Sequence, residues 1–146
     1  MNKYIKIMCI YISCFSMIGC YEEYNPTEDL FDIKGDVAQV SAMTSPVSTA
    51  AANSSINLTI KCHAAGTDIK EFKFYQRIGT SGTYLATVTV PFVANFSEAE
   101  RVHVVSVPYT VPNEKGKVFS LQVEAVTTNG LVSLRRTLSP TNVTIN

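Results

Sequence analysis

The most constraining feature of this sequence is an alternation of apolar and polar residues, with a period of two, that runs from Asp36 to the C-terminus. The clearest stretches are INLTIKC at 56–62 and FSLQVEA at 119–125. Such alternation is typical of β-strands with one face in a core, because successive side chains point to opposite sides of a strand. No apolar stripe with helical spacing extends beyond about one turn. The sequence therefore predicts an all-β fold.

We expect strands at 37–42, 56–62, 69–78, 84–90, 102–107 and 119–125, followed by a last pairing segment from Leu131. Asn129-Gly130 predicts a tight turn between two strands of a hairpin, because both residue types tolerate positive φ. Pro108 and Pro112 are expected to bracket a connection. In the strand at 84–90, the even-numbered residues are expected to point one way. About seven short strands in roughly 110 residues fit two antiparallel sheets packed face to face.

Three of these strands resemble strands of fibronectin type III and related immunoglobulin-like domains. The patterns that carry the resemblance are Ile56-x-Leu58-x-Ile60, Ile69-x-x-Phe72-x-Phe74-Tyr75 and Phe119-x-Leu121-x-Val123-x-Ala125-x-Thr127-x-x-Gly130. They are similar to the second, third and penultimate strands of that family. The resemblance implies an immunoglobulin-like β-sandwich of about seven antiparallel strands over residues 36–146.

The first residues have the pattern of a secretory signal peptide. Met1 to Lys6 contain two lysines and no acid, and Ile7 to Gly19 carry no charge. A transmembrane helix needs about 20 apolar residues, so this stretch is short for a membrane span. A basic start followed by a short apolar run is typical of a signal peptide, which we expect over 1–19. The alternative is a buried amphipathic helix.

The end of that run, Met17-Ile18-Gly19-Cys20, resembles the lipobox of bacterial lipoproteins. The resemblance implies cleavage after Gly19 and acylation of Cys20, whose lipid chains would hold the protein at a membrane. Residues 20–35 are expected to form a flexible acidic tether. Within it, Glu22 and Glu23 resemble the export signal of Bacteroidetes surface lipoproteins. The implied location is the surface of the outer membrane, with its periplasmic face as the alternative.

Composition and motifs argue against several function classes. The chain has 12 basic and 12 acidic residues, so it lacks the excess positive charge that nucleic-acid binding requires. Its histidines are His63 and His103, and it contains no CxxC, HExxH, GxSxG or glycine-rich phosphate motif. We therefore expect no catalytic residue, no metal site and no cofactor. Cys62 shares an apolar strand face with Leu58 and Ile60 and is expected to be a buried, unreactive thiol.

Binding is the remaining class of function. The candidate ligand-contacting aromatics are Tyr75 and Tyr84, expected on exposed strand faces, and Phe92, Phe96 and Tyr109, expected in irregular connections. The alternative is that these rings cap the core. We expect a non-catalytic binding or structural module that is accessory to glycan or nutrient capture, with the membrane, glycans or other envelope proteins as partners. Two further hypotheses stay open: an adhesion or fimbria-like subunit, and a small hydrolase whose site is assembled from loops.

Overall fold

A computed structural model of the protein describes residues 37–146. The predictions on the signal peptide, on Gly19 and Cys20, and on Glu22 and Glu23 in the tether lie outside these residues. The described residues all belong to one compact unit. Over 37–146 every regular element is a β-strand, and this part of the chain contains no helix long and apolar enough to cross a membrane.

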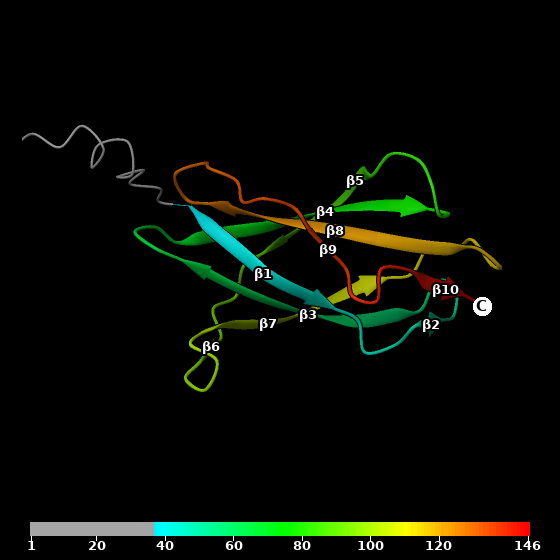
Figure 1. Cartoon of the computed structure of the whole chain (residues 1–146), viewed down its shortest axis with the longest axis horizontal. Helices are drawn as coiled ribbons and strands as arrows, with labels where there is room; N and C mark the ends of the chain where they lie inside the picture. Colours follow the sequence, from blue (N-terminus) through cyan, green and yellow to red (C-terminus); the bar gives the residue numbers. More distant parts are fainter. Residues whose placement is uncertain (1–36) are drawn as a thin grey trace, which may run out of the picture. The chain divides into compact units, whose positions relative to one another are not determined.

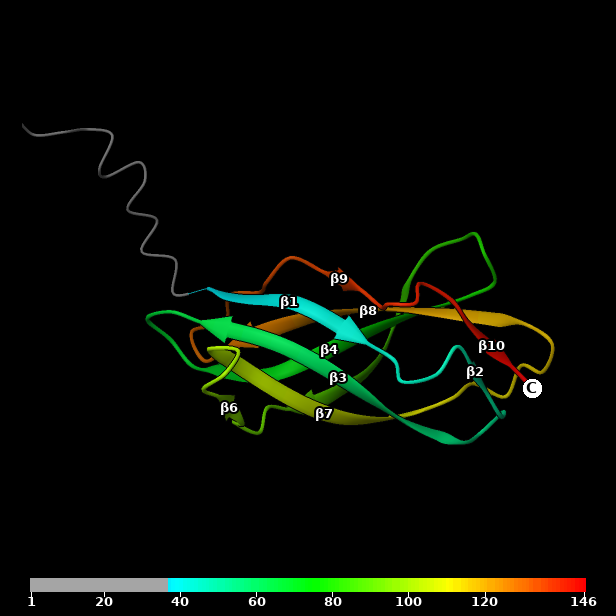
Figure 2. The same cartoon turned by 60° about the horizontal axis from the view of Figure 1, so that its bottom comes forward.

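The strands form two sheets (Figures 1 and 2). The first sheet has the order β1 (Ala38–Thr44), β3 (Ser55–Ala64), β7 (Val102–Thr110) and β6 (Phe96–Ser97). The second has the order β2 (Thr49–Ala50), β10 (Val143–Ile145), β8 (Val118–Thr127), β4 (Ile69–Ile78) and β5 (Leu85–Pro91), and β9 (Arg136–Thr137) also pairs with β8. All of these pairings are antiparallel except β2 with β10.

This strand order is that of an immunoglobulin-like β-sandwich. The order β1-β3-β7-β6 corresponds to strands A, B, E and D of that fold. In the second sheet, β9 and β10 take the place of strand G, and β8, β4 and β5 take those of F, C and C′. The predicted fold class is therefore confirmed.

The core lies between the two sheets and follows the predicted alternation. On β3, Leu58, Ile60 and Cys62 are fully buried. On β4, in the facing sheet, Phe72 and Phe74 are buried. The inward residues of β8 complete the centre of the core: Phe119, Leu121, Val123 and Ala125. The prediction of a strand at 69–78 matches the bounds of β4, whereas β1 and β8 each extend a few residues beyond their predicted ranges.

Pro108 does not bracket a connection as predicted but lies inside β7. Val111 N–H donates to Ser54 O on the β3 side, at 2.8 Å, and Val104 N–H donates to Asn95 O on the opposite side, also at 2.8 Å. Successive residues of a strand alternate in direction, so the Pro108 nitrogen, like that of Val104, faces away from β3. Proline is tolerated there because that edge needs no hydrogen bond from it.

β5 differs from the predicted strand at 84–90, whose even-numbered residues were expected to point one way. Of its residues only Val90 is partly buried against the core, while Ala86 and Val88 are exposed. β5 lies at the edge of the second sheet, where it pairs with β4 alone. A register shift in this pairing also places Val90 opposite the inward Phe72 but Ala86 opposite the outward Tyr75, so the two do not point one way. The segment 45–54, expected to be a loop, contains the short strand β2.

The hairpin predicted at Asn129-Gly130 is confirmed. Thr127 N–H donates to Leu131 O at 2.9 Å, and Ser133 N–H donates to Ala125 O at 2.8 Å. Gly130 has a φ of +86°, in the left-handed region that glycine adopts at little cost. The returning chain continues into β9 alongside β8, which brings Arg135 to the outer face of the second sheet.

Candidate functional site

The outer face of the second sheet carries a concentration of aromatic and charged side chains. Because Phe72 and Phe74 point into the core, the residues between and after them on β4 point outward. The outward residues Lys73, Tyr75 and Arg77 lie opposite three polar residues of β8, in the register Lys73–Glu124, Tyr75–Gln122 and Arg77–Ser120. This face is the candidate site.

Its first cluster joins three side chains from three segments. The Tyr75 hydroxyl donates to Glu124 Oε1 at 2.6 Å, and Arg135 Nε donates to Glu124 Oε2 at 3.2 Å. The Arg135 guanidinium carbon also lies 3.6 Å from the centre of the Tyr75 ring, within the range of a cation–π contact. Together they cover Glu124, which is only 8% exposed. A nearly buried carboxylate therefore has both of its oxygens satisfied.

The electrostatics of this cluster follow from Glu124. The pKa of Tyr75 is raised above its ordinary value, chiefly because its hydroxyl donates to that carboxylate. The pKa of Arg135 is raised as well, again first by its hydrogen bond to Glu124. Both groups thus keep their protons, and the cluster remains a fixed set of donors rather than a proton-transfer pair.

A second cluster repeats the arrangement farther along the same strands. The Tyr84 hydroxyl donates to Ser120 Oγ at 3.0 Å, and the Arg77 guanidinium carbon lies 4.8 Å from the Tyr84 ring centre. Ser120 is fully buried beneath them. Within the described residues, the buried Arg77 Nε has no hydrogen-bond partner. We call the surface formed by Tyr75, Arg77, Tyr84, Gln122, Glu124 and Arg135 the tyrosine–arginine face.

The five predicted aromatics separate into different environments. Tyr75 and Tyr84 share the tyrosine–arginine face. Phe92 is half-buried and packs edge-on against Phe72, with ring centres 5.8 Å apart. Phe96 is exposed and packs against His103. The placement of Phe96 and Tyr109 in irregular connections is wrong, since they lie in β6 and β7. Tyr84, expected on a strand, lies just before β5, which begins at Leu85.

Tyr109 is a core residue. It is buried, its ring stacks on Phe119 with centres 6.3 Å apart, and its hydroxyl donates to Gln76 Oε1. Its hydroxyl end borders a hollow of about 290 Å³ between β5 and β7, lined by Gln76, Thr87, Val88, Pro108, Tyr109 and Thr110. The odd-numbered residues of β7 face inward, so a residue at this position is drawn into the core.

The histidines lie on opposite faces of the first sheet. His63 is exposed on the outer side of β3, next to the inward-facing Cys62. His103 lies on the inner side, at the start of β7, and packs edge-on against the rings of Phe92 and Phe96. Burial raises the pKa of the Cys62 thiol to about 11. Residues 37–146 contain no group of three or more histidine, cysteine or acidic side chains that could hold a metal ion.

Four members of the tyrosine–arginine face were not singled out from the sequence. Arg77, Gln122 and Glu124 have the pattern of ordinary polar residues on alternating strands, and Arg135 that of a solvated charge next to Arg136. The available signal was Glu124, an acid on a strand whose neighbours on both sides are apolar and buried. A carboxylate in such a setting requires donors close by.

Comparisons with known proteins give one weak structural similarity. No protein-family model matches the chain, and no curated protein matches it. Among solved structures, it is similar to the PKD domain of an M14-like peptidase from a Thermoplasmatales archaeon. That match has 14% sequence identity and a TM-score of 0.42, and it covers 75% of this chain and 92% of the other. The fold assignment therefore rests on the strand order described above.

Proposed function

We propose that the protein is a non-catalytic lipoprotein of the bacterial outer-membrane surface, whose immunoglobulin-like domain binds a surface glycan. The anchoring part of the proposal is supported by the lipobox-like Met17-Ile18-Gly19-Cys20 and by the following Glu22 and Glu23. The strand patterns at 56–60, 69–75 and 119–130 support a domain of the fibronectin type III kind.

The binding part rests on one observation, the pairing of a tyrosine with an arginine twice on one sheet face. Tyr75 and Tyr84 each offer a ring with a hydroxyl, and Arg135 and Arg77 each place a guanidinium group with N–H donors over one face of a ring. Sugars combine apolar C–H faces with hydroxyl groups, so rings and fixed donors are the groups that bind them. The β4–β8 pairing supports these side chains on a rigid frame.

Replacement of Tyr75 by alanine is expected to weaken binding about tenfold, as a loss of about 1.4 kcal/mol would. The measurement is a glycan array with the wild-type chain, followed by calorimetric titration of each hit. Tyr84→Ala should act in the same direction, and Val47→Ala, at an exposed position away from this face, should bind like wild type. Equal binding by the Tyr75→Ala, Tyr84→Ala and wild-type chains would remove the tyrosine–arginine face from the proposal.

Replacement of Cys20 by alanine is expected to release the protein from membranes, because the thiol is the proposed attachment point of the lipid. Cell fractionation measures this, and protease treatment of intact cells shows on which side of the outer membrane the domain lies. Digestion on intact cells supports a surface location. Protection until the outer membrane is opened would favour the periplasmic alternative, and a Cys20→Ala chain still found in membranes would contradict acylation.

A further inference from the structure

Exposed apolar side chains gather at one end of the sandwich. We define the proximal end as the one at which β1 begins; β3 and β8 end there, and β4 begins there, as the pairs Ala38–Ala64 and Ile69–Thr127 show (Figure 1). Five of the eight exposed large hydrophobic residues among the described residues belong to the loops and the short strand β6 at this end. This group, which we call the apolar rim, comprises Val93, Phe96, Leu131, Val132 and Leu134.

The exposure of the apolar rim is large. Leu134 is 92% exposed and Val93 is 69% exposed. Leu134 also borders a groove of about 470 Å³ that is lined by residues 37–40 of β1 and its approach and by Arg135 and Arg136. Scattered apolar residues are normal on a protein surface. A concentration of them is typical of a surface that contacts another protein or a membrane.

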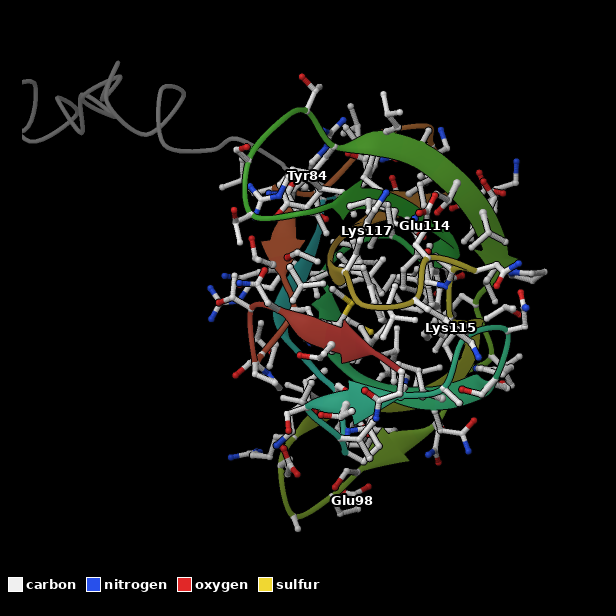
Figure 3. All side chains as sticks on the ribbon, turned by 90° about the vertical axis from the view of Figure 1, so that its right-hand side faces the viewer. Tyr84, Glu98, Glu114, Lys115 and Lys117 are labelled. Carbon is white, nitrogen blue, oxygen red and sulfur yellow. The ribbon has the colours of Figure 1, made fainter. Side chains whose placement is uncertain are left out.

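The opposite end has a different character. Figure 3 looks onto this distal end, where the turn before β8 presents Glu114, Lys115 and Lys117 to solvent. Glu114 and Lys117 form an exposed ion pair at 2.8 Å. The exposed large hydrophobic residues are therefore more numerous at the proximal end, although its loops also carry exposed charged residues, among them Asp68, Glu98 and Arg101.

The chain itself indicates what the apolar rim meets. The described chain begins at Val37, at the proximal end, and 16 residues (21–36) separate it from Cys20. A segment of that length reaches at most about 55 Å when fully extended. A lipid on Cys20 would thus hold the proximal end within reach of the bilayer at a local concentration of about millimolar.

We propose that the proximal end docks on the membrane surface, with Leu134 and Val132 at the boundary between headgroups and acyl chains. The inference rests on the proposed lipid anchor. Arg136 is exposed, lines the groove and forms no ion pair with another described residue. It would contact lipid phosphates. Apolar side chains with neighbouring cations are the combination that seats a protein in the interfacial layer. Docking would hold the proximal end against the bilayer and keep the distal end away from it.

A single tryptophan tests the proposal, because the chain has none of its own. The protein is the chain from Cys20 onward, which holds the whole core between Ala38 and Ile145. Its other thiol, Cys62, is fully buried, so a maleimide lipid couples at Cys20. Leu134→Trp reports on the apolar rim, and Leu85→Trp, at a 68% exposed position outside the apolar rim, is the matched control.

Both coupled variants are placed in vesicles of phosphatidylethanolamine and phosphatidylglycerol that contain lipids brominated on the acyl chains. We expect a blue-shifted emission from Leu134→Trp and quenching at least about twofold stronger than for Leu85→Trp, since docked side chains enter the interface by about 5–10 Å. Adding Val132→Ser and Arg136→Ser to Leu134→Trp should reduce the quenching toward the control value.

Equal quenching at the two positions, or none at either, would overturn the proposal. So would a blue shift of Leu134→Trp that depends on protein concentration without vesicles, because the apolar rim would then meet another protein. Chemical coupling separates this test from the anchoring proposal. A Cys20 found unacylated in cells by mass spectrometry would contradict the anchor, while the vesicle result would still decide whether the proximal end can dock.

Discussion

Replacement of Phe119 by alanine is expected to lower the free energy of unfolding by about 4 kcal/mol, within the range for large-to-alanine changes at fully buried aromatic positions. Phe119 is 0% exposed at the start of β8. It pairs with Ile78 on one side and Val143 on the other, and its ring stacks on Tyr109 from the facing sheet. The cavity would thus open where three strands and both sheets meet, and rigid neighbours cannot collapse into it.

The free energy of unfolding of the wild type and of Phe119→Ala is measured by urea unfolding, which is monitored by circular dichroism. A single domain of this size typically has a stability of about 5–15 kcal/mol, so the variant should be partly unfolded or have a much lower midpoint. Leu85→Ala, at an exposed position of β5, is the control and should stay within about 0.5 kcal/mol of wild type. A Phe119→Ala chain as stable as this control would contradict the assignment of Phe119 to the core.

The strands could be predicted because their alternation reflects burial on one face only. β3, β4 and β8 lie between neighbours in their sheets, so their central inward residues are apolar and their positions are clear in the sequence. Asn129-Gly130 was equally informative, since a tight turn depends on local conformation. The predictions were correct where the structure is determined by residues close together in the sequence.

The errors have one cause, which is that a strand's place in its sheet is not encoded locally. Pro108 suggests a break in any isolated segment, yet β7 accommodates it because its nitrogen points to an open edge. β5 has the composition of a buried strand, yet Val88 is exposed because no second neighbour covers it. Which edge stays open is decided by pairings between residues far apart in the chain.

The candidate site likewise combines a feature that nearby residues determine with contacts between residues far apart in the chain. Tyr75 was identified from the polar side of its strand, and the structure gives it a half-buried position on the outer sheet face. Its partners could not be named, because Glu124 lies 49 residues later on β8 and Arg135 follows the next hairpin. The antiparallel pairing of β4 with β8 and the return of the chain into β9 bring the three together. A site of this kind arises from sheet register and has no contiguous motif.

Replacement of Glu124 by alanine is expected to destabilise the domain by about 1 kcal/mol, since it removes the acceptor of the Tyr75 hydroxyl, while the exposed Arg135 can bond to water instead. It should also lower the pKa of Tyr75, because the hydrogen bond to Glu124 is the main cause of its rise. A raised pKa in the folded state stabilises the fold below the pKa of the unfolded chain, and that stabilisation is lost as the pH rises through the folded value. The wild type should therefore lose stability in this alkaline window more steeply than Glu124→Ala.

Urea unfolding at neutral and alkaline pH measures the stability, and carbon-13 NMR of the tyrosine ring measures the pKa of Tyr75. Tyr75→Phe is the matched variant, since it removes only the hydroxyl and leaves Glu124 paired with Arg135. A double-mutant cycle between Glu124→Ala and Tyr75→Phe isolates their coupling, which should be about 1 kcal/mol for a hydrogen bond to a charged, nearly buried acceptor. If the two changes are additive and the pKa of Tyr75 is the same with and without Glu124, the cluster does not order the tyrosine–arginine face, and ligand binding should then survive Glu124→Ala.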